Sequence, residues 1–171
     1  PSEKDPSAAI WMAKLLKEAG LPDGVFNVVM GDVVAVDRLL AHPDVAAVSF
    51  VGSTPIARSV YEKGTSFGKR VQALGGAKNH IIAMPDAVLE QSVPNIAESA
   101  FGNAGQRCLA GSVLTVVGEA RELLLPKLVE HAETIKMGFG LDEGVSLGPV
   151  IRGDARERIH RLVDEGVAAG A

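Results

Sequence analysis

The sequence lacks the features that mark secreted, membrane-spanning or nucleic-acid-binding proteins. One cysteine among 171 residues excludes an intrachain disulfide and fits a reducing compartment. No apolar run approaches the ~20 residues of a membrane-spanning helix, and these residues show no signal-peptide pattern. The 17 lysine and arginine residues are outnumbered by 21 aspartate and glutamate residues and form no basic stripe, so we expect neither nucleic acid nor a membrane as a partner.

Aromatic residues are also scarce, at 4% of the chain, whereas apolar residues make up 47%. Aliphatic side chains must therefore form the core, and the length suits one ordinary domain or two partial ones. The chain begins at Pro1 without an initiator methionine, directly before an expected helix, and ends at Ala171 just past another. We therefore expect a piece of a longer protein.

Apolar patterns of two kinds alternate along the chain and predict an α/β fold. Helical spacing predicts helices over residues 7–19, 33–40, 55–63, 88–104, 121–136 and 152–169. Short continuous apolar runs predict strands over residues 25–29, 46–51, 70–74, 80–84 and 112–117. Because continuous apolar runs are typical of buried parallel strands, we expect a Rossmann-like, largely parallel sheet with helices on both faces.

The single cysteine, Cys108, is the first candidate for chemistry. It follows an expected helix and the residues Gly-Asn-Ala-Gly-Gln-Arg. The adjacent cation of Arg107 would stabilise a reactive thiolate, which favours a nucleophile. Most free cysteines are small buried hydrophobes, and the segment alone leaves both interpretations open. Arg107 could also clamp a substrate carboxylate, or be an ordinary solvated arginine.

Two glycine turns and an N-terminal polar pair are candidates for ligand binding. Gly52-Ser53-Thr54 follows a predicted strand and opens a helix, a place where backbone N–H groups can hold a phosphate. The Ser53 hydroxyl can bind that phosphate or cap the helix, and capping is the commoner role. Gly75-Gly76 ends another strand and either lets a ligand approach the backbone closely or is a plain tight turn. Glu3-Lys4 could reach a ribose hydroxyl or merely be a solvated helix end.

The four histidines show no metal-binding pattern with the cysteine. Zinc sites need several closely spaced Cys or His ligands, and these residues are far apart: His42, His80, His131 and His160. A Cys/His pair stays open, because such pairs meet in space rather than in sequence.

Taken in order, these segments resemble those of the aldehyde dehydrogenase superfamily, over essentially the whole chain. The resemblance is carried by residues 1–29, 50–54, 102–108 and 140–151. It implies a partial aldehyde dehydrogenase-like fold. Residues 1–77 would be the distal part of the NAD-binding domain and residues 78–171 the N-terminal part of the catalytic domain, with Cys108 in the cleft between them.

The resemblance also implies a mechanism and a set of cofactor-binding residues. Cys108 would attack the aldehyde to give a thiohemiacetal, and hydride transfer to NAD would leave a thioacyl-enzyme. Glu3 would hold the adenosine ribose with Lys4 nearby. Gly52 and Ser53 would lie at the pyrophosphate and Gly75 near the nicotinamide. A carboxylate at the ribose favours NAD over NADP, because it would repel a 2′-phosphate.

One departure from the family pattern points to the acyl acceptor. Most hydrolytic members carry a glutamate four residues before the lysine of their Gly-Gly-Lys motif, whereas here Leu74 stands four residues before Lys78. Leucine cannot activate water as a general base, and shifting the alignment by one residue gives Ala73, which cannot either. The thiol of coenzyme A could accept the acyl group instead. Residues 76–80, 84–87 and 105–108 resemble one CoA-acylating subgroup, the methylmalonate-semialdehyde dehydrogenases, in which the arginine before the cysteine, here Arg107, recognises the substrate carboxylate.

We therefore expect oxidation of methylmalonate or malonate semialdehyde by NAD, with acyl transfer to CoA to give propionyl-CoA or acetyl-CoA and CO2. The alternatives are a hydrolytic semialdehyde dehydrogenase and a non-catalytic piece. The family's oxyanion-stabilising asparagine would lie upstream of these residues and its nicotinamide-ribose glutamate downstream, so we expect little or no activity from the isolated chain. The parent protein is expected to be a dimer or tetramer of identical chains, in a bacterial cytoplasm or a mitochondrial matrix.

Overall fold

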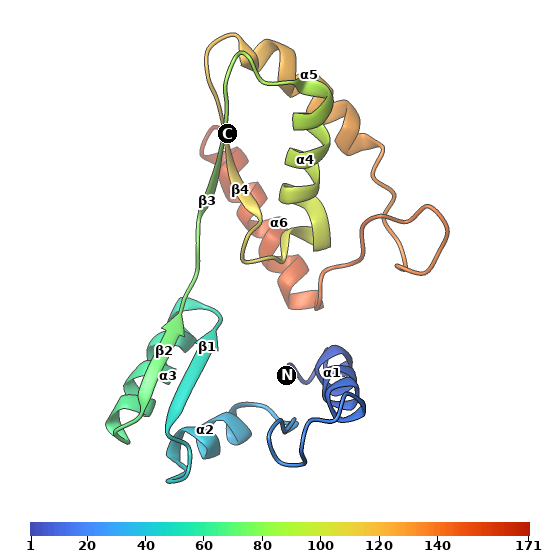
Figure 1. The fold of residues 1–171 in the computed structure, drawn as a ribbon. Coiled ribbons are helices and arrows are strands. Elements are labelled where there is room, and N and C mark those ends of the chain that lie inside the picture. The colour runs from blue at the N-terminus through green and yellow to red at the C-terminus, as the bar shows by residue number, and fades with distance from the viewer. The chain divides into compact units, whose positions relative to one another are not determined.

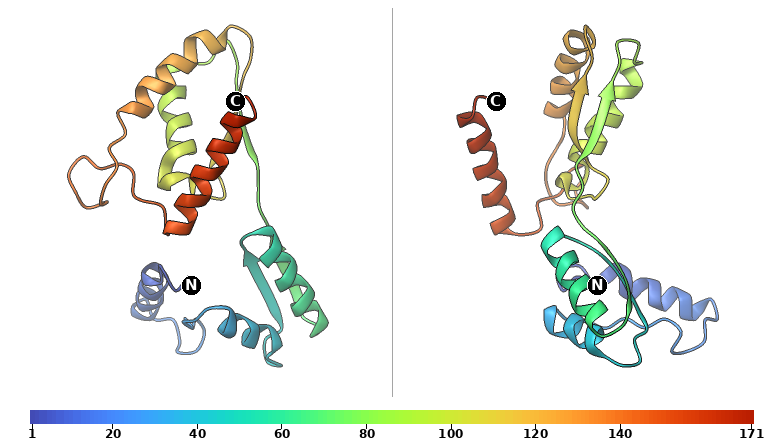
Figure 2. Two further views of the ribbon diagram at one scale, coloured as in Figure 1. Left: turned by 180° about the vertical axis from the view of Figure 1, so that it is seen from behind. Right: turned by 90° about the vertical axis from the view of Figure 1, so that its left-hand side faces the viewer.

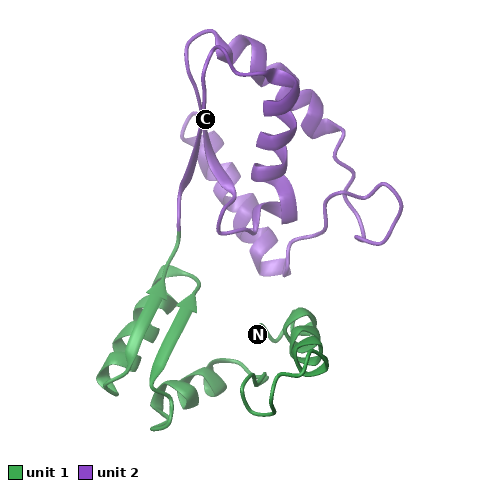
Figure 3. Cartoon of the chain, viewed as in Figure 1, with its two compact units in different colours: residues 1–76 green, residues 77–171 purple.

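The computed structural model describes residues 1–171 as two compact units, unit 1 at Pro1–Gly76 and unit 2 at Ala77–Ala171 (Figure 3). Each unit contains one pair of parallel strands with a crossover helix between them, and Figure 1 labels the elements. No helix combines the length and the apolar character needed to cross a membrane.

Unit 1 is built on two parallel strands joined by a helix. Its elements are α1 (Ser7–Glu18), α2 (Val33–Ala41), β1 (Ala47–Val51), α3 (Thr54–Ser66) and β2 (Arg70–Leu74). The strands pair in register from Ala47 opposite Arg70 to Val51 opposite Leu74. Parallel strands need such a crossover, and α3 packs on both of them. Its glycine at position 64 allows the close approach, since a Cβ there would lie 2.6 Å from Val71 Cγ2.

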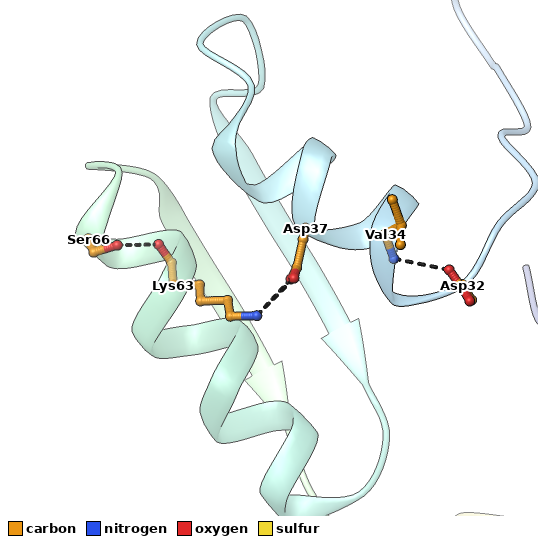
Figure 4. A network of polar contacts seen from close by, with 5 residues as sticks. All are labelled: Asp32, Val34, Asp37, Lys63 and Ser66. Atoms are coloured by element: carbon orange, nitrogen blue, oxygen red, sulfur yellow. Dashed lines mark hydrogen bonds and ion pairs between the residues drawn. The ribbon is translucent and has the colours of Figure 1, made fainter.

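Polar contacts fix α2 and the loop that leads into β1. The Asp32 carboxylate caps α2 by accepting from Val34 N at 3.0 Å, and Asp37 pairs with Lys63 of α3 at 2.8 Å (Figure 4). The loop is held by Lys69, which is buried and donates from Nζ to the carbonyl oxygens of His42 and Val45, both at 2.6 Å. A buried ammonium is stable only with such partners.

Unit 2 repeats the strand–helix–strand plan and adds two helices. Its elements are β3 (Asn79–Ala83), α4 (Leu89–Phe101), the 3-10 turn η1 (Gly102–Gly105), β4 (Gly111–Val116), α5 (Ala120–Glu133) and α6 (Gly153–Ala168). Helix α4 connects the parallel strands β3 and β4, and α5 lies beside α4 (Figure 2). The core is Ala83, Val93, Ile96 and Leu124. Leu124 is 0% exposed, and burying such a side chain contributes about 1.5–3 kcal/mol. Helix α6 has no buried residue.

The expected α/β class with parallel strands and helices is confirmed, and one predicted strand is wrong. Residues 25–29 form turns and irregular chain instead of a strand, with Val25 65% and Val29 56% exposed. A continuous apolar run predicts burial but supplies no pairing partner, and a strand without a neighbour leaves its backbone unbonded. The helix expected over residues 88–104 ends at Phe101, because Gly102 has an extended ψ of 135° and Asn103 turns left-handed.

Candidate active site

Cys108 lies in a tight turn of residues 107–110, here called the Cys108 turn, directly before β4. Ala110 N donates to the carbonyl oxygen of Arg107 at 3.1 Å and closes the turn. The thiol is exposed. An exposed thiol on a short turn is open to a substrate, and the structure does not support the alternative of a small buried hydrophobe.

A left-handed stretch leads into this turn. Asn103 and Ala104 have φ of 53° and Gly105 has φ of 70°, a conformation that costs roughly 1–2 kcal/mol at a residue with a Cβ. Gln106 stabilises the stretch by donating from Nε2 to Asn103 O at 3.1 Å. Its Oε1 also accepts from Ile151 N at 3.1 Å, which ties the turn to the segment before α6.

Asn79, the first residue of β3, bonds two backbone carbonyl groups of the Cys108 turn. Its Nδ2 donates to Cys108 O at 2.8 Å and to Ala110 O at 3.0 Å. Gly111 N, just beyond the turn, donates to Ser99 Oγ of α4 at 3.2 Å. The turn is therefore fastened to a strand, to a helix and to a loop.

A register shift brings Asn79 to this position. Asn79 pairs with Gly111 whereas His80 pairs with Val113, so Ser112 is an extra residue in β4. Such bulges redirect side chains next to functional sites. A Cβ on Gly111 would overlap Ile81 Cδ1, so a larger residue here would require the Ile81 side chain to shift.

Arg107 points back to helix α4, where its Nη2 pairs with Glu98 Oε1 at 2.8 Å. The two side chains are 43% and 67% exposed, and exposed pairs of this kind are worth only about 0.2–1 kcal/mol. A Cβ on Gly102 would lie 2.5 Å from Glu98 Oε1 and 2.8 Å from Arg107 Cζ, so this glycine leaves room for the pair. The guanidinium keeps further N–H donors for an incoming carboxylate.

In unit 1, the two glycine turns meet at the carboxyl ends of β1 and β2. Gly52 N donates to Leu74 O at 3.1 Å, and Gly76 N donates to Thr54 Oγ1 at 2.9 Å. A Cβ on Gly75 would lie 2.9 Å from Thr54 Oγ1, so the two turns touch. Ligands of parallel α/β sheets bind at this edge.

Ser53 lies at the start of α3, and its side chain makes no capping hydrogen bond. Capping, the commoner role for such a serine, is therefore wrong here. The hydroxyl remains available to a ligand, as do the glycine backbones beside it.

Glu3 and Lys4 are exposed at the chain start, and Lys4 N donates to Ser2 Oγ at 3.2 Å. No hydrogen bond or ion pair joins either side chain to the glycine turns. The hollow of about 520 Å³ in unit 1 is lined by α1 and residues 21–30 and includes neither of them. Cys108 and Arg107 belong to unit 2, whereas the five expected cofactor residues belong to unit 1.

No histidine is hydrogen-bonded to Cys108. His42 Nδ1 accepts from Asp44 N at 3.2 Å, a local contact in the loop before β1. No group of three or more His, Cys, Asp or Glu side chains is arranged to hold a metal ion. Leu74 is the last residue of β2 and is 50% exposed, and it offers no group that could take a proton from water.

Comparison with known proteins gives a consistent picture over the full chain. The model of the aldehyde dehydrogenase family matches residues 1–171. The malonate-semialdehyde dehydrogenase of Pseudomonas aeruginosa is 50% identical over 172 residues, which cover 100% of this chain and 35% of that protein.

Two solved structures carry the same fold. The methylmalonate-semialdehyde dehydrogenase of Oceanimonas doudoroffii matches with a TM-score of 0.92 and 48% identity, over 99% of this chain and 35% of that one. An NAD-dependent aldehyde dehydrogenase of Sinorhizobium meliloti matches with a TM-score of 0.92 and 36% identity, over 100% and 34%. The chain thus spans about a third of the length of these relatives.

Proposed function

This chain belongs to the aldehyde dehydrogenase family, and we propose that the protein carrying it is an NAD-dependent, CoA-acylating semialdehyde dehydrogenase. Its substrate would be methylmalonate or malonate semialdehyde, and its product propionyl-CoA or acetyl-CoA with CO2. The observation that carries the proposal is the exposed Cys108 in its fastened turn, within a chain half identical to a malonate-semialdehyde dehydrogenase from end to end.

Cys108 is the nucleophile in this proposal. Its sulfur forms a bond to the aldehyde carbon, and the carbonyl oxygen takes up the negative charge. When that oxygen re-forms the double bond, the C–H bond breaks, its electron pair leaves as a hydride, and a thioester remains on Cys108. Bound NAD+ supplies the hydride acceptor.

Leu74 supports CoA rather than water as the acyl acceptor. Water needs a general base to attack a thioester at neutral pH, and the side chains of Leu74 and Ala73 at the end of β2 cannot act as one. The CoA thiol gives up its proton and its sulfur forms the new C–S bond, while the C–S bond to Cys108 breaks and Cys108 leaves as a thiolate. Loss of the substrate carboxylate as CO2, with uptake of one proton, gives the shortened acyl-CoA.

Arg107 supports a substrate that bears a carboxylate. Its guanidinium is next to the nucleophile in sequence and is only partly satisfied by Glu98. A carboxylate can take the remaining donors in a charge-assisted pair, the geometry for which arginine is suited. A neutral aldehyde would gain nothing from this contact.

The glycine turns of unit 1 fit the phosphate-bearing part of a dinucleotide. Gly52 and Ser53 would lie at the pyrophosphate and Gly75 near the nicotinamide, while Glu3 would bind the adenosine ribose with Lys4 nearby. What supports this is the meeting of the turns at the carboxyl edge of β1 and β2 and a Ser53 hydroxyl that is not spent on capping. Glu3 favours NAD over NADP because a carboxylate would repel a 2′-phosphate.

In the same proposal residues 1–77 are the distal part of the NAD-binding domain and residues 78–171 the start of the catalytic domain. The protein would act on small molecules as a dimer or tetramer of identical chains, in a bacterial cytoplasm or a mitochondrial matrix. The 171 residues alone would have little or no activity, because they are about a third of the relatives' length and loss of one oxyanion donor alone costs ~10²–10³ in rate.

The test is an assay of the full-length protein with methylmalonate semialdehyde and NAD, with and without CoA, in which NADH and acyl-CoA are both followed. We expect turnover that requires CoA and yields propionyl-CoA. Equal turnover without CoA, with free acid as product, would replace this function by the hydrolytic one. No NADH under either condition would leave the non-catalytic alternative.

A further inference from the structure

We propose that Asn79 is a positioning residue for Cys108: it holds the peptide group that follows the nucleophile and the one that follows Ala110, so that the sulfur keeps one direction. The inference rests on the proposed function, because a held thiol matters only where the thiol reacts. Asn79 touches the backbone of the Cys108 turn and not the sulfur, so its effect on the reaction is exerted through Cys108.

The contact is made by a single nitrogen atom. Asn79 Nδ2 reaches Cys108 O at 2.8 Å and Ala110 O at 3.0 Å, so its two N–H bonds are both used. A third bond within the turn runs from Ala110 N to Arg107 O at 3.1 Å. The Cα of Cys108 lies between peptide groups whose orientations these bonds set, and the direction of its Cα–Cβ bond follows from them.

The rest of unit 2 keeps Asn79 in place for this contact. The extra residue Ser112 in β4 sets Asn79 opposite Gly111, at the point where the Cys108 turn enters the strand. Gly111 N is held in turn by Ser99 Oγ at 3.2 Å. A bulge costs ladder hydrogen bonds, and bulges are found where a side chain has to be re-aimed next to a site.

An amide is the group that this position requires. Asn79 faces two carbonyl oxygens, which are acceptors, so the side chain must offer two donors from one atom. Alanine offers none. Aspartate has the same shape but brings acceptor oxygens against acceptor oxygens, and it can donate one hydrogen bond only when its carboxyl is protonated.

The experiment compares Asn79→Ala and Asn79→Asp in the full-length protein with the matched pair Asn95→Ala and Asn95→Asp. Asn95 is exposed on α4 and its side chain makes no hydrogen bond. The readouts are kcat, the KM for NAD and the rate at which iodoacetamide alkylates Cys108, read on the tryptic peptide 108–121. That peptide begins at Cys108 because trypsin cleaves after Arg107.

We expect both Asn79 variants to lose about 10- to 100-fold in kcat, because small displacements of a reacting group cost up to that much. The KM for NAD should change less than threefold, and the alkylation rate of Cys108 should change by severalfold at a fixed pH. The ratio of the native kcat to the kcat of Asn79→Asp, both measured at the same pH, should fall as the pH is lowered. The reason is that the protonated carboxyl regains one hydrogen-bond donor. The Asn95 variants should match the native protein in every readout.

A control variant that is less stable but keeps the contacts of Asn79 shows whether a loss of kcat comes from the position of Cys108 or from lower stability. Val93→Ala removes a buried core side chain and should lower the melting temperature at least as much as Asn79→Ala, with kcat within threefold of native. If Asn79→Ala does not fold, the pH dependence of Asn79→Asp alone decides the question. The proposal is overturned if the Asn79 variants keep native kcat and alkylation rates, or if Val93→Ala loses kcat in proportion to its stability.

Cys108→Ser separates this inference from the proposed function. If the native protein shows no CoA-dependent activity, or Cys108→Ser keeps it, the proposed function fails and the alkylation rates still report whether Asn79 sets the thiol. If Cys108→Ser abolishes activity and the Asn79 variants do not reduce it, only the role of Asn79 is wrong.

Discussion

Two loops of this chain are fastened to their sheets in the same way. In unit 1, Lys69 stands just before β2 and bonds two carbonyls of the loop that leads into β1, those of His42 and Val45. In unit 2, Asn79 begins β3 and bonds two carbonyls of the turn that leads into β4, those of Cys108 and Ala110. In both cases one side-chain nitrogen at the start of a parallel strand holds the loop that enters the neighbouring strand.

The two side chains, Lys69 and Asn79, differ in charge, in burial and in the residues of the loop that each one holds. Lys69 is a buried cation, 8% exposed, and its loop carries none of the proposed catalytic or binding residues. Asn79 is a neutral, half-buried amide, and its turn carries an exposed thiol. A lysine at position 79 would add a second positive charge to the one that Arg107 already brings next to Cys108, whereas an amide holds the turn and adds none. We therefore expect the Lys69 contact to stabilise unit 1 and the Asn79 contact to position Cys108.

The largest effect on activity is expected from removal of the Cys108 thiol. Cys108→Ser should lower CoA-dependent turnover by on the order of 10⁴-fold or more, since loss of a nucleophile abolishes the covalent step. The melting temperature should stay close to native, because the side chain is exposed. Turnover is followed by NADH formation and unfolding by circular dichroism. Residual turnover above a hundredth of native would contradict Cys108 as the nucleophile.

Removing the Lys69 contacts in unit 1 should lower the free energy of unfolding and leave the reactivity of Cys108 unchanged. Lys69→Met removes the ammonium and leaves the carbonyls of His42 and Val45 without their donor. Hydrogen bonds to charged groups contribute about 1.5–3 kcal/mol each, so for these two bonds we expect a loss of roughly 3–6 kcal/mol in the free energy of unfolding. Urea denaturation measures it. The alkylation rate of Cys108 should be native, and a large change in that rate would show that the two fastenings are not separable.

The neighbour of the thiol should govern substrate choice. Arg107→Ala should lower kcat/KM for the acid semialdehyde by about 10- to 100-fold, roughly the value of one hydrogen bond to a charge. Activity with a neutral aldehyde such as propanal should change less than threefold, which steady-state kinetics would show. Glu98→Gln removes the partner of Arg107 and serves as the control that keeps the guanidinium. An equal loss with both aldehydes would assign Arg107 to the turn or to stabilisation of the Cys108 thiolate rather than to the substrate carboxylate.

Replacing an exposed lysine should have the smallest effect on stability, and it serves as the control for Lys69→Met. Lys63 pairs with Asp37 at 2.8 Å while its side chain is 46% exposed (Figure 4). Lys63→Met should cost about 0.2–1 kcal/mol, and the cost should shrink further in high salt. Denaturation at low and high ionic strength tests this. A loss as large as that of Lys69→Met would mean that burial does not distinguish the two lysines.

Most of the secondary structure follows from the apolar pattern, because helices and buried strands differ in spacing and length. The strand predicted over residues 25–29 does not form, since hydrophobicity predicts burial but not the neighbour with which a strand must pair. The glycine turns at Gly52 and Gly75 are visible in the sequence as breaks after apolar runs. Their meeting depends on the pairing of β1 with β2.

The fastening of the Cys108 turn could not be predicted in the same way. Asn79 is 29 residues from Cys108 in sequence, and only the shifted register of β3 and β4 brings them together. A reactive residue can be predicted from its type and its neighbours in sequence. A side chain that bonds only to backbone carbonyls cannot, because every residue has such a carbonyl and no residue type marks the partner. Asn79 and Ser99 therefore received no role from the sequence.

The most direct test of the account is to look for the acyl group on Cys108. The full-length protein is mixed with methylmalonate semialdehyde and NAD without CoA, quenched in acid, and the peptide 108–121 is weighed by mass spectrometry. We predict an acylated peptide that persists in the absence of CoA and disappears, with formation of propionyl-CoA, when CoA is added. An unmodified peptide under turnover conditions, or an acyl group that water removes as fast as CoA does, would contradict the account.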